Sequence, residues 1–248
     1  MVMFKLRRKK RKSTRTFNTI LKNPVFRVVE AYKTLRTNIL FSVPAVEGRS
    51  LRFMFTSANP NEGKSTTSAN TAITFAQQTD VKVILVDADL RKSTLHKYFG
   101  LSSKRGLSNF LSGQDELENC IQRVPNVENL YFMASGVLPP NPAELLAGKR
   151  MDVLFSELDK MFDIVIIDTP PINVVADAIP ISSFVDGVIM VATDNKTTYN
   201  ELQDAVKSLK VADAKILGVV LNKARTSNYR SRQKYSNYYR TSEEETQQ

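Results

Sequence analysis

Short runs of apolar residues recur along the chain, and longer stretches between them repeat apolar positions every three or four residues. The short runs are rich in β-branched and aromatic residues, so we predict that six of them form β-strands. These runs are Leu51–Thr56, Val81–Val86, Leu130–Met133, Ile164–Ile167, Gly187–Val191 and Ile216–Leu221.

The stretches with helical spacing predict α-helices at Val28–Leu40, Lys64–Gln78, Ala143–Met161 and Thr197–Val211. Strands that are apolar on both faces and alternate with helices predict an α/β fold, with a mostly parallel sheet and helices on both faces. Ligands bind such sheets at the carboxyl ends of the strands, so functional side chains are expected there. The proline-rich segment 136–142 predicts a rigid loop before the third helix.

The formal net charge of +10 is concentrated at the two ends of the chain. Residues 1–15 contain eight basic and no acidic residues, and residues 223–248 contain six basic and three acidic ones. The segment between them is therefore close to neutral. We predict a flexible basic arm at 1–25, a folded domain at 26–224, and a flexible tyrosine-rich tail at 225–248.

Several classes of protein are excluded by composition. The only cysteine is Cys120 and the only histidine is His96, which excludes a disulfide scaffold and a His/Cys metal site. No run reaches the roughly 18 apolar residues of a membrane span, and no apolar signal-peptide core follows the basic start. A cytoplasmic location is expected.

The segment 57–66 predicts a phosphate-binding loop. It lies between the strand ending at Thr56 and a helix, so loop amides and the helix N-terminus present several N–H donors to an anion. Gly63 lets the backbone approach the phosphates, Lys64 reaches the β and γ oxygens, and the Ser65 hydroxyl can bind Mg²⁺. Ala58 replaces the first glycine of the usual pattern, and an ordinary strand-to-helix turn is the alternative. The residues expected at the nucleotide are Asn59, Pro60, Asn61, Glu62, Gly63, Lys64, Ser65 and Thr66, with Asn222 at the base.

Two further strands deliver carboxylates at their carboxyl ends. Asp87 and Asp89 follow one strand, and Asp168 ends another. A strand-end aspartate beside a phosphate loop completes a Mg²⁺ coordination shell, usually through water. The alternative is that such aspartates cap the next helix. Together with the loop, they predict a protein that binds ATP or GTP.

On these motifs the chain resembles the bacterial tyrosine kinases, specifically the free-standing cytoplasmic kinase subunits of Gram-positive capsule and exopolysaccharide systems. The resemblance runs from about Phe26 to the C-terminus. It rests on the loop 57–66, the Asp-Ala-Asp-Leu-Arg segment 87–91, the strand end 168–171, the segment 139–146 and the tyrosine-rich tail. It implies a P-loop NTPase-like kinase domain at 26–224 that uses ATP and Mg²⁺.

The resemblance also implies roles for single residues. Lys64, Asp87 and Asp89 are the expected catalytic residues, with Asp87 deprotonating the acceptor tyrosine and Asp89 supporting the metal or the base. Ser65, Asp87 and Asp168 are the expected magnesium ligands. Arg91 either senses the γ-phosphate or pairs with an acid within the fold.

Half of the eight tyrosines lie in the tail, in a segment too polar to pack a core. The resemblance predicts that they are phosphoacceptors for neighbouring copies, and the alternative is a basic-aromatic tail that contacts RNA or membrane. These tyrosines are Tyr229, Tyr235, Tyr238 and Tyr239.

Self-association, as a ring, is expected through Glu30, Lys33 and Arg36, although Lys33 stands where the family has an arginine. The expected partner is a membrane adaptor of the polysaccharide co-polymerase type, which would recruit the kinase to the inner face of the membrane. The basic arm either lies on anionic lipid or is simply solvated. Nucleic acid is not an expected partner.

Partitioning and septum-positioning ATPases are the second candidate class, because they look similar across the same strands. They carry a signature lysine directly after the first loop glycine. Asn59 occupies that place here, so the residue that defines the competing class is missing.

Overall fold

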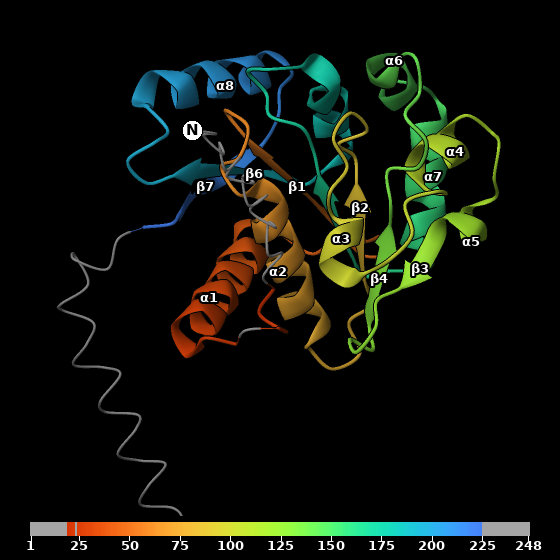
Figure 1. Cartoon of the computed structure of the whole chain (residues 1–248), viewed down its shortest axis with the longest axis horizontal. Coiled ribbons are helices and arrows are strands. Elements are labelled where there is room, and N and C mark those ends of the chain that lie inside the picture. Colours follow the sequence, from red (N-terminus) through yellow and green to blue (C-terminus); the bar gives the residue numbers. More distant parts are fainter. Residues whose placement is uncertain (1–18, 23, 225–248) are drawn as a thin grey trace, which may run out of the picture.

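A seven-stranded β-sheet forms the centre of the molecule, between two layers of helices (Figure 1). The computed structural model describes residues 19–22 and 24–224. The strand order is β3-β4-β2-β5-β1-β6-β7, and only β3 runs antiparallel to its neighbour. The strands are β1 (Leu51–Ser57), β2 (Val83–Asp87), β3 (Ile121–Arg123), β4 (Leu130–Met133), β5 (Ile164–Asp168), β6 (Gly187–Thr193) and β7 (Ile216–Asn222).

The helices divide between the two faces of the sheet, as their buried residues show. One face is covered by α1 (Phe26–Ser42), α2 (Lys64–Ala76) and α3 (His96–Phe99). The other face is covered by α4 (Leu107–Leu111), α5 (Leu117–Cys120), α6 (Pro142–Leu146), α7 (Arg150–Asp159), the 3₁₀-helices η1 (Ala176–Ala178) and η2 (Pro180–Phe184), and α8 (Tyr199–Val211).

Alternate side chains of each central strand enter different cores. In β1, Phe53 and Phe55 pack on the α2 side, while Met54 packs on the α7 side, and none of the three is exposed. Because side chains alternate along a strand, an uninterrupted apolar run is buried on both faces of a sheet. The predicted α/β class, with helices on both faces, is confirmed.

The register of the sheet brings functional side chains together. In the parallel pairing of β2 with β5, Asp87 lies opposite Asp168. Phe55, two residues before the end of β1, lies opposite Asp168 on the other side of β5. The carboxylates and the loop that follows β1 therefore meet at one edge of the sheet.

The predicted helix Ala143–Met161 is wrong in its continuity, because two helices occupy this range. α6 ends at Leu146 and α7 begins at Arg150, and Gly148 lies in the break with its N–H donated to the Leu145 carbonyl. Glycine costs about 1 kcal/mol relative to alanine inside a helix, which favours a break at this point. Pro142, which was predicted as part of the loop, is the first residue of α6. Proline is favoured there because an N–H at the first position of a helix has no intrahelical acceptor.

Strand β3 and the helices α3, α4 and α5 were not predicted, because three to five residues are too few to show a periodicity. The folded part also begins before residue 26. Ile20 is buried and its N–H donates to Asn70 Oδ1 of α2 at 2.9 Å. Of the predicted arm, residues 19–22 and 24–25 are described; its other residues and the predicted tail lie outside the described residues.

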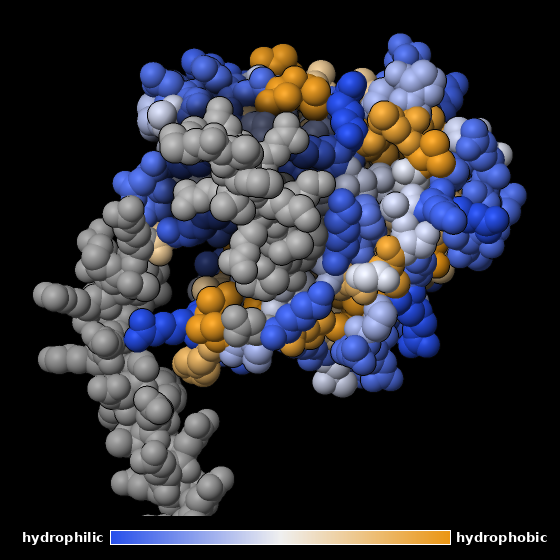
Figure 2. Space-filling model, viewed as in Figure 1, coloured by the Kyte–Doolittle hydropathy of each residue, from blue (hydrophilic) through white to orange (hydrophobic). Residues whose placement is uncertain are grey.

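Within the described ranges, no helix is both long and apolar enough to cross a membrane. On the face in Figure 2, hydrophobic side chains form separate patches among hydrophilic ones rather than one continuous apolar surface.

We predict that Gly106→Ala destabilises the protein, since the added Cβ would lie 2.0 Å from the carbonyl oxygen of Ala134, the residue that follows β4. This neighbour is backbone, so part of the chain must shift, and we expect the free energy of unfolding to fall by about 1–3 kcal/mol. Denaturant unfolding measures the change. Gly218→Ala is the control, because its Cβ would meet nothing within 4 Å. Equal stabilities of the two variants would contradict the prediction.

Candidate nucleotide and phosphoryl-transfer site

The loop between β1 and α2 is shaped by Gly63. This residue precedes the first turn of α2 with a φ of +95°, in the left-handed region, and no side chain caps the helix there. The left-handed conformation favours glycine, and a Cβ at this position would also lie 2.0 Å from Asn222 Nδ2, so a side chain here would displace Asn222. The first N–H groups of a helix have no intrahelical acceptor, and this end of α2 is therefore suited to an anion.

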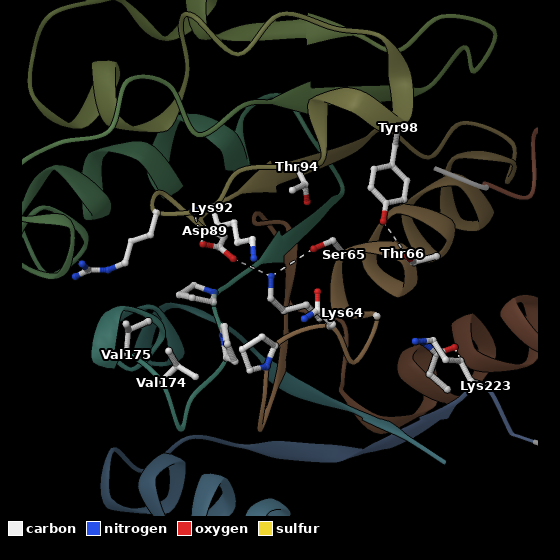
Figure 3. A pocket seen from close by; sticks show the side chains of 17 residues that line it. Lys64, Ser65, Thr66, Asp89, Lys92, Thr94, Tyr98, Val174, Val175 and Lys223 are labelled. Carbon is white, nitrogen blue, oxygen red and sulfur yellow. Dashed lines mark hydrogen bonds and ion pairs between the residues drawn. The ribbon is translucent and has the colours of Figure 1, made fainter. Parts of the chain in front are cut away.

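Lys64 places its ammonium group among carboxylates. Its Nζ lies 3.0 Å from Asp89 Oδ2 and 3.3 Å from Ser65 Oγ (Figure 3). It also lies 3.5 Å from Asp168 Oδ2. Burial alone would lower the pKa of Lys64, but the charges of Asp168 and Asp89 outweigh burial and raise it. Lys64 therefore remains a cation in the interior of the site.

Asp87 is completely buried at the end of β2. Its Oδ2 accepts hydrogen bonds from Ser93 Oγ at 2.8 Å and from the Leu95 N–H at 3.3 Å, and its Oδ1 accepts one from the Asp89 N–H at 3.2 Å. Burial, followed by repulsion from the Asp168 carboxylate, raises the pKa of Asp87 to about 7, although Ser93 and Lys64 act against this rise. A carboxyl group with this pKa can exchange a proton near neutral pH.

Asp168, at the end of β5, is also buried, and burial raises its pKa in spite of Lys64 and Ser65. Its Oδ1 is buried and has no hydrogen-bond partner among the described residues. A buried oxygen without a donor is costly unless a ligand supplies the missing contact.

The unpartnered Asp168 Oδ1 indicates that a divalent cation fits the site, because a cation would supply the contact that this oxygen lacks. Three carboxylates surround one ammonium group, so negative charge is in excess there. Within the described part of the chain, no group of three or more His, Cys, Asp or Glu side chains is arranged to hold a metal by itself. Mg²⁺ is usually bound by one or two carboxylates together with substrate phosphates, so Ser65 and Asp168 fit a magnesium ion that arrives with a nucleotide.

A cleft of about 730 Å³ lies over these groups at the carboxyl edge of the sheet (Figure 3). Residues of the phosphate loop and Asp89 line it, as do Pro170 and Pro171 of the strand end 168–171, together with several residues that the sequence did not single out. The latter are Lys92, Thr94, Tyr98, Val174, Val175 and Lys223. Tyr98 is held by a 2.8 Å hydrogen bond between its hydroxyl and Thr66 Oγ1. Only the position of these residues in the fold, in segments far apart along the chain, brings them to the loop.

Two residues predicted at the nucleotide have other contacts. The Glu62 carboxylate is buried and accepts hydrogen bonds from the Asn59 N–H at 3.0 Å and from the Thr197 hydroxyl at 2.5 Å. Asn222 also lines the cleft, but its Nδ2 donates to the Glu62 carbonyl at 2.9 Å and its Oδ1 accepts from the Lys223 N–H at 2.8 Å. Both side chains support the loop from within the protein.

Arg91 pairs with an acid, which was one of the two expectations for it. Its guanidinium makes a bidentate contact with Asp177 of η1, at 2.6 and 3.0 Å, and Asp177 is buried. The carboxylate raises the pKa of Arg91. Fork-to-fork pairing fixes the orientation of the guanidinium at the rim of the cleft.

The three charged residues expected in self-association differ in their contacts. Lys33 Nζ pairs with Glu30 Oε1 at 2.8 Å, and both side chains are about half exposed. Arg36 is directed inward, and its Nη1 donates to the Thr74 carbonyl of α2 at 2.7 Å. The predicted phosphoacceptors Tyr229, Tyr235, Tyr238 and Tyr239 lie outside the described residues.

The family described as "ParA: NUBPL iron-transfer P-loop NTPase" matches residues 53–248. The chain is 42% identical to tyrosine-protein kinase YwqD of Bacillus subtilis over 200 residues, which are 81% of this chain and 83% of that protein. It is 37% identical to the putative tyrosine-protein kinase CapB of Staphylococcus aureus over 214 residues, which are 86% of this chain and 92% of that protein. It matches 27% of the length of the longer tyrosine-protein kinase etk of Escherichia coli, with 37% identity.

Two solved structures share the fold over most of their length. The kinase domain of Escherichia coli tyrosine kinase ETK superimposes with a TM-score of 0.78 at 35% identity, covering 89% of this chain and 85% of that one. The chimerical protein CapA2B2 superimposes with a TM-score of 0.76 at 34% identity, and the match covers 83% of this chain and 88% of that one.

We predict a pH-dependent effect of Asp87→Asn on stability. The pKa of Asp87 rises from 3.8 to about 7 on folding, so between these values the folded chain holds a proton that the unfolded chain has lost. This residue therefore favours folding at low pH, and its contribution declines up to about pH 7. The free energy of unfolding of the variant, relative to the original protein, should rise between pH 4 and 7 and stay level above. Chemical denaturation with a chelator present measures it, and a difference that is constant with pH would refute the assignment.

Proposed function

The chain belongs to the family of bacterial tyrosine-protein kinases, and we propose that it transfers the γ-phosphoryl group of magnesium-bound ATP to tyrosines in the C-terminal segments of neighbouring copies. It is a tyrosine-protein kinase of capsule and exopolysaccharide systems, with a P-loop that binds a nucleotide. The observation that carries the finer proposal is the convergence of five polar residues at one edge of the sheet: Lys64, Ser65 and Asp89 line the cleft, and the buried Asp87 and Asp168 end the neighbouring strands β2 and β5.

Phosphoryl transfer requires positioning and charge stabilisation more than covalent catalysis. Lys64 stabilises the negative charge that develops on the β and γ oxygens. Ser65 and Asp168 would hold the magnesium ion, which would neutralise part of the phosphate charge. Asp89, which lines the cleft and pairs with Lys64, keeps the ammonium group in place.

We assign the general base to Asp87. A phenol with a pKa of about 10 is protonated at neutral pH, so the reaction benefits from a nearby proton acceptor. The phenolic oxygen forms a bond to the γ-phosphorus, the bond from that phosphorus to the bridging oxygen of ADP breaks, and the phenolic proton passes to the Asp87 carboxylate. The pKa of about 7 supports this role, because the group is then substantially ionised at neutral pH yet basic enough to take a proton.

The partitioning-ATPase alternative is not supported at Asn59. The Asn59 N–H donates to the Glu62 carboxylate at 3.0 Å, and the Asn59 carbonyl accepts a hydrogen bond from the Ser57 hydroxyl at 2.8 Å. Asn59 therefore contributes to the internal support of the loop.

Assembly and membrane recruitment are further parts of the proposal. Glu30 and Lys33 are exposed on α1 and available for contact between copies, whereas Arg36 stabilises the carboxyl end of α2. A membrane adaptor would recruit the kinase from the cytoplasm to the membrane, which is supported by the likeness to the chimerical protein CapA2B2. The basic residues of segment 1–15 would add attraction to anionic lipid.

Mixing two complementary variants tests transfer between copies. The first carries Phe at Tyr229, Tyr235, Tyr238 and Tyr239, so it retains the site but lacks the acceptors. The second is Lys64→Met, which retains the acceptors and should lose at least about 100-fold in rate, because charge on the transferred group is no longer stabilised. With labelled ATP, each variant alone should give little phosphotyrosine, and the mixture should label the Lys64→Met chain.

The two chains are made with different lengths of affinity tag, so that a gel separates them. An unlabelled Lys64→Met chain in the mixture would contradict transfer between copies. Strong labelling of Lys64→Met alone would contradict the role of Lys64.

A further inference from the structure

The phosphate loop is held in shape by a buried carboxylate that makes no ion pair among the described residues. Glu62 is only 1% exposed, and its two oxygens accept the Asn59 N–H and the Thr197 hydroxyl. Burying a charge is costly unless hydrogen bonds satisfy it. The conformation of the loop around Glu62 therefore depends on these two donors.

Thr197 lies in the connection between β6 and α8, 135 residues from Glu62 in sequence. Its hydroxyl accepts a hydrogen bond from the Thr193 N–H at 2.8 Å and donates one to Glu62 Oε1 at 2.5 Å. Because the first contact leaves the hydroxyl proton free for donation, Thr197 is oriented toward the carboxylate. The Thr193 hydroxyl in turn donates to the Glu62 carbonyl at 3.0 Å.

A further contact joins the same two segments. Lys196 Nζ donates to the Pro60 carbonyl at 3.2 Å. The loop between β1 and α2 is thus attached to the end of β6 and to the segment that connects β6 with α8, which lie beside it (Figure 1). None of these contacts is to a side chain of the catalytic cluster.

We propose that Thr197 is a positioning residue for the nucleotide, which acts through Glu62 to hold the phosphate loop in its binding conformation. Loop amides bind phosphate well only when they are already directed at it, since ordering the loop during binding would subtract from the affinity. The inference deepens the proposed function, but it rests on nucleotide binding and not on transfer to tyrosine.

The proposal makes a specific statement about ligands. The loop and the first turn of α2 face phosphates that ADP and ATP share, so loss of the Thr197 hydroxyl should weaken both nucleotides by the same factor. The groups that act on the transferred phosphoryl, Lys64 and Asp87, keep their contacts. The maximal rate at saturating ATP should therefore change little.

Thr197→Val is the direct test, because valine keeps the shape and removes the hydroxyl. Binding of a fluorescent ADP analogue and of ATP by competition should weaken about tenfold, as expected when a hydrogen bond to a buried charge is lost. In the labelled-ATP assay, KM for ATP should rise by a similar factor, with kcat within about twofold. Thr197→Ser, which restores the hydroxyl, should restore the affinity.

Thr74→Val is the matched control. Its hydroxyl donates to the Asn70 carbonyl near the other end of α2, so this variant loses one hydrogen bond away from the loop and should bind ADP normally. A double-mutant cycle with Glu62→Gln completes the test, and the two substitutions should be strongly non-additive because they interrupt one contact. Unchanged ADP affinity in Thr197→Val, or a loss that Thr197→Ser does not restore, would overturn the proposal. Because these measurements report only nucleotide binding, they test the role of Thr197 even if tyrosine is not the acceptor of the phosphoryl group.

Discussion

The site is organised by the burial of three carboxylates around a single ammonium group. Lys64 lies within 3.5 Å of both Asp89 and Asp168, and the fully buried Asp87 lies opposite Asp168 in the sheet. Each of these charges would be unfavourable alone in the interior. Together they leave an excess of negative charge and one buried carboxylate oxygen without a partner, which suits a cation that enters with a phosphorylated ligand.

The rest of the fold serves to hold these groups at one edge. The parallel register sets Asp87 beside Asp168, and the turn at Gly63 starts α2 so that Lys64 enters the cluster. On the opposite side of the loop, the buried Glu62 attaches it to the β6–α8 connection. The carboxylates that follow β2 and β5 and the supporting residues of the β6–α8 connection thus approach one short loop from different sides.

Much of the site could be predicted from the sequence, because a strand followed by Gly63, Lys64 and Ser65 places these residues by local geometry alone. The α/β class followed from strands apolar on both faces. The break between α6 and α7 at Gly148 was missed because the helical spacing of apolar residues continues across it. The antiparallel strand β3 was missed because its three residues are too few to show an alternation of apolar and polar positions. Thr197 was missed for a different reason: it contacts Glu62 only because β6 and β1 are neighbours, and sequence spacing does not report tertiary proximity.

Calorimetric titration of ADP, with and without Mg²⁺, tests most directly whether the carboxylate cluster receives the cation. The comparison is between the original protein and Asp168→Asn. The account predicts that Mg²⁺ strengthens ADP binding at least tenfold in the original protein, and that this gain is largely lost in the variant because the buried oxygen that completes the metal site has lost its charge. An equal gain from Mg²⁺ in both proteins, or no gain in either, would contradict it.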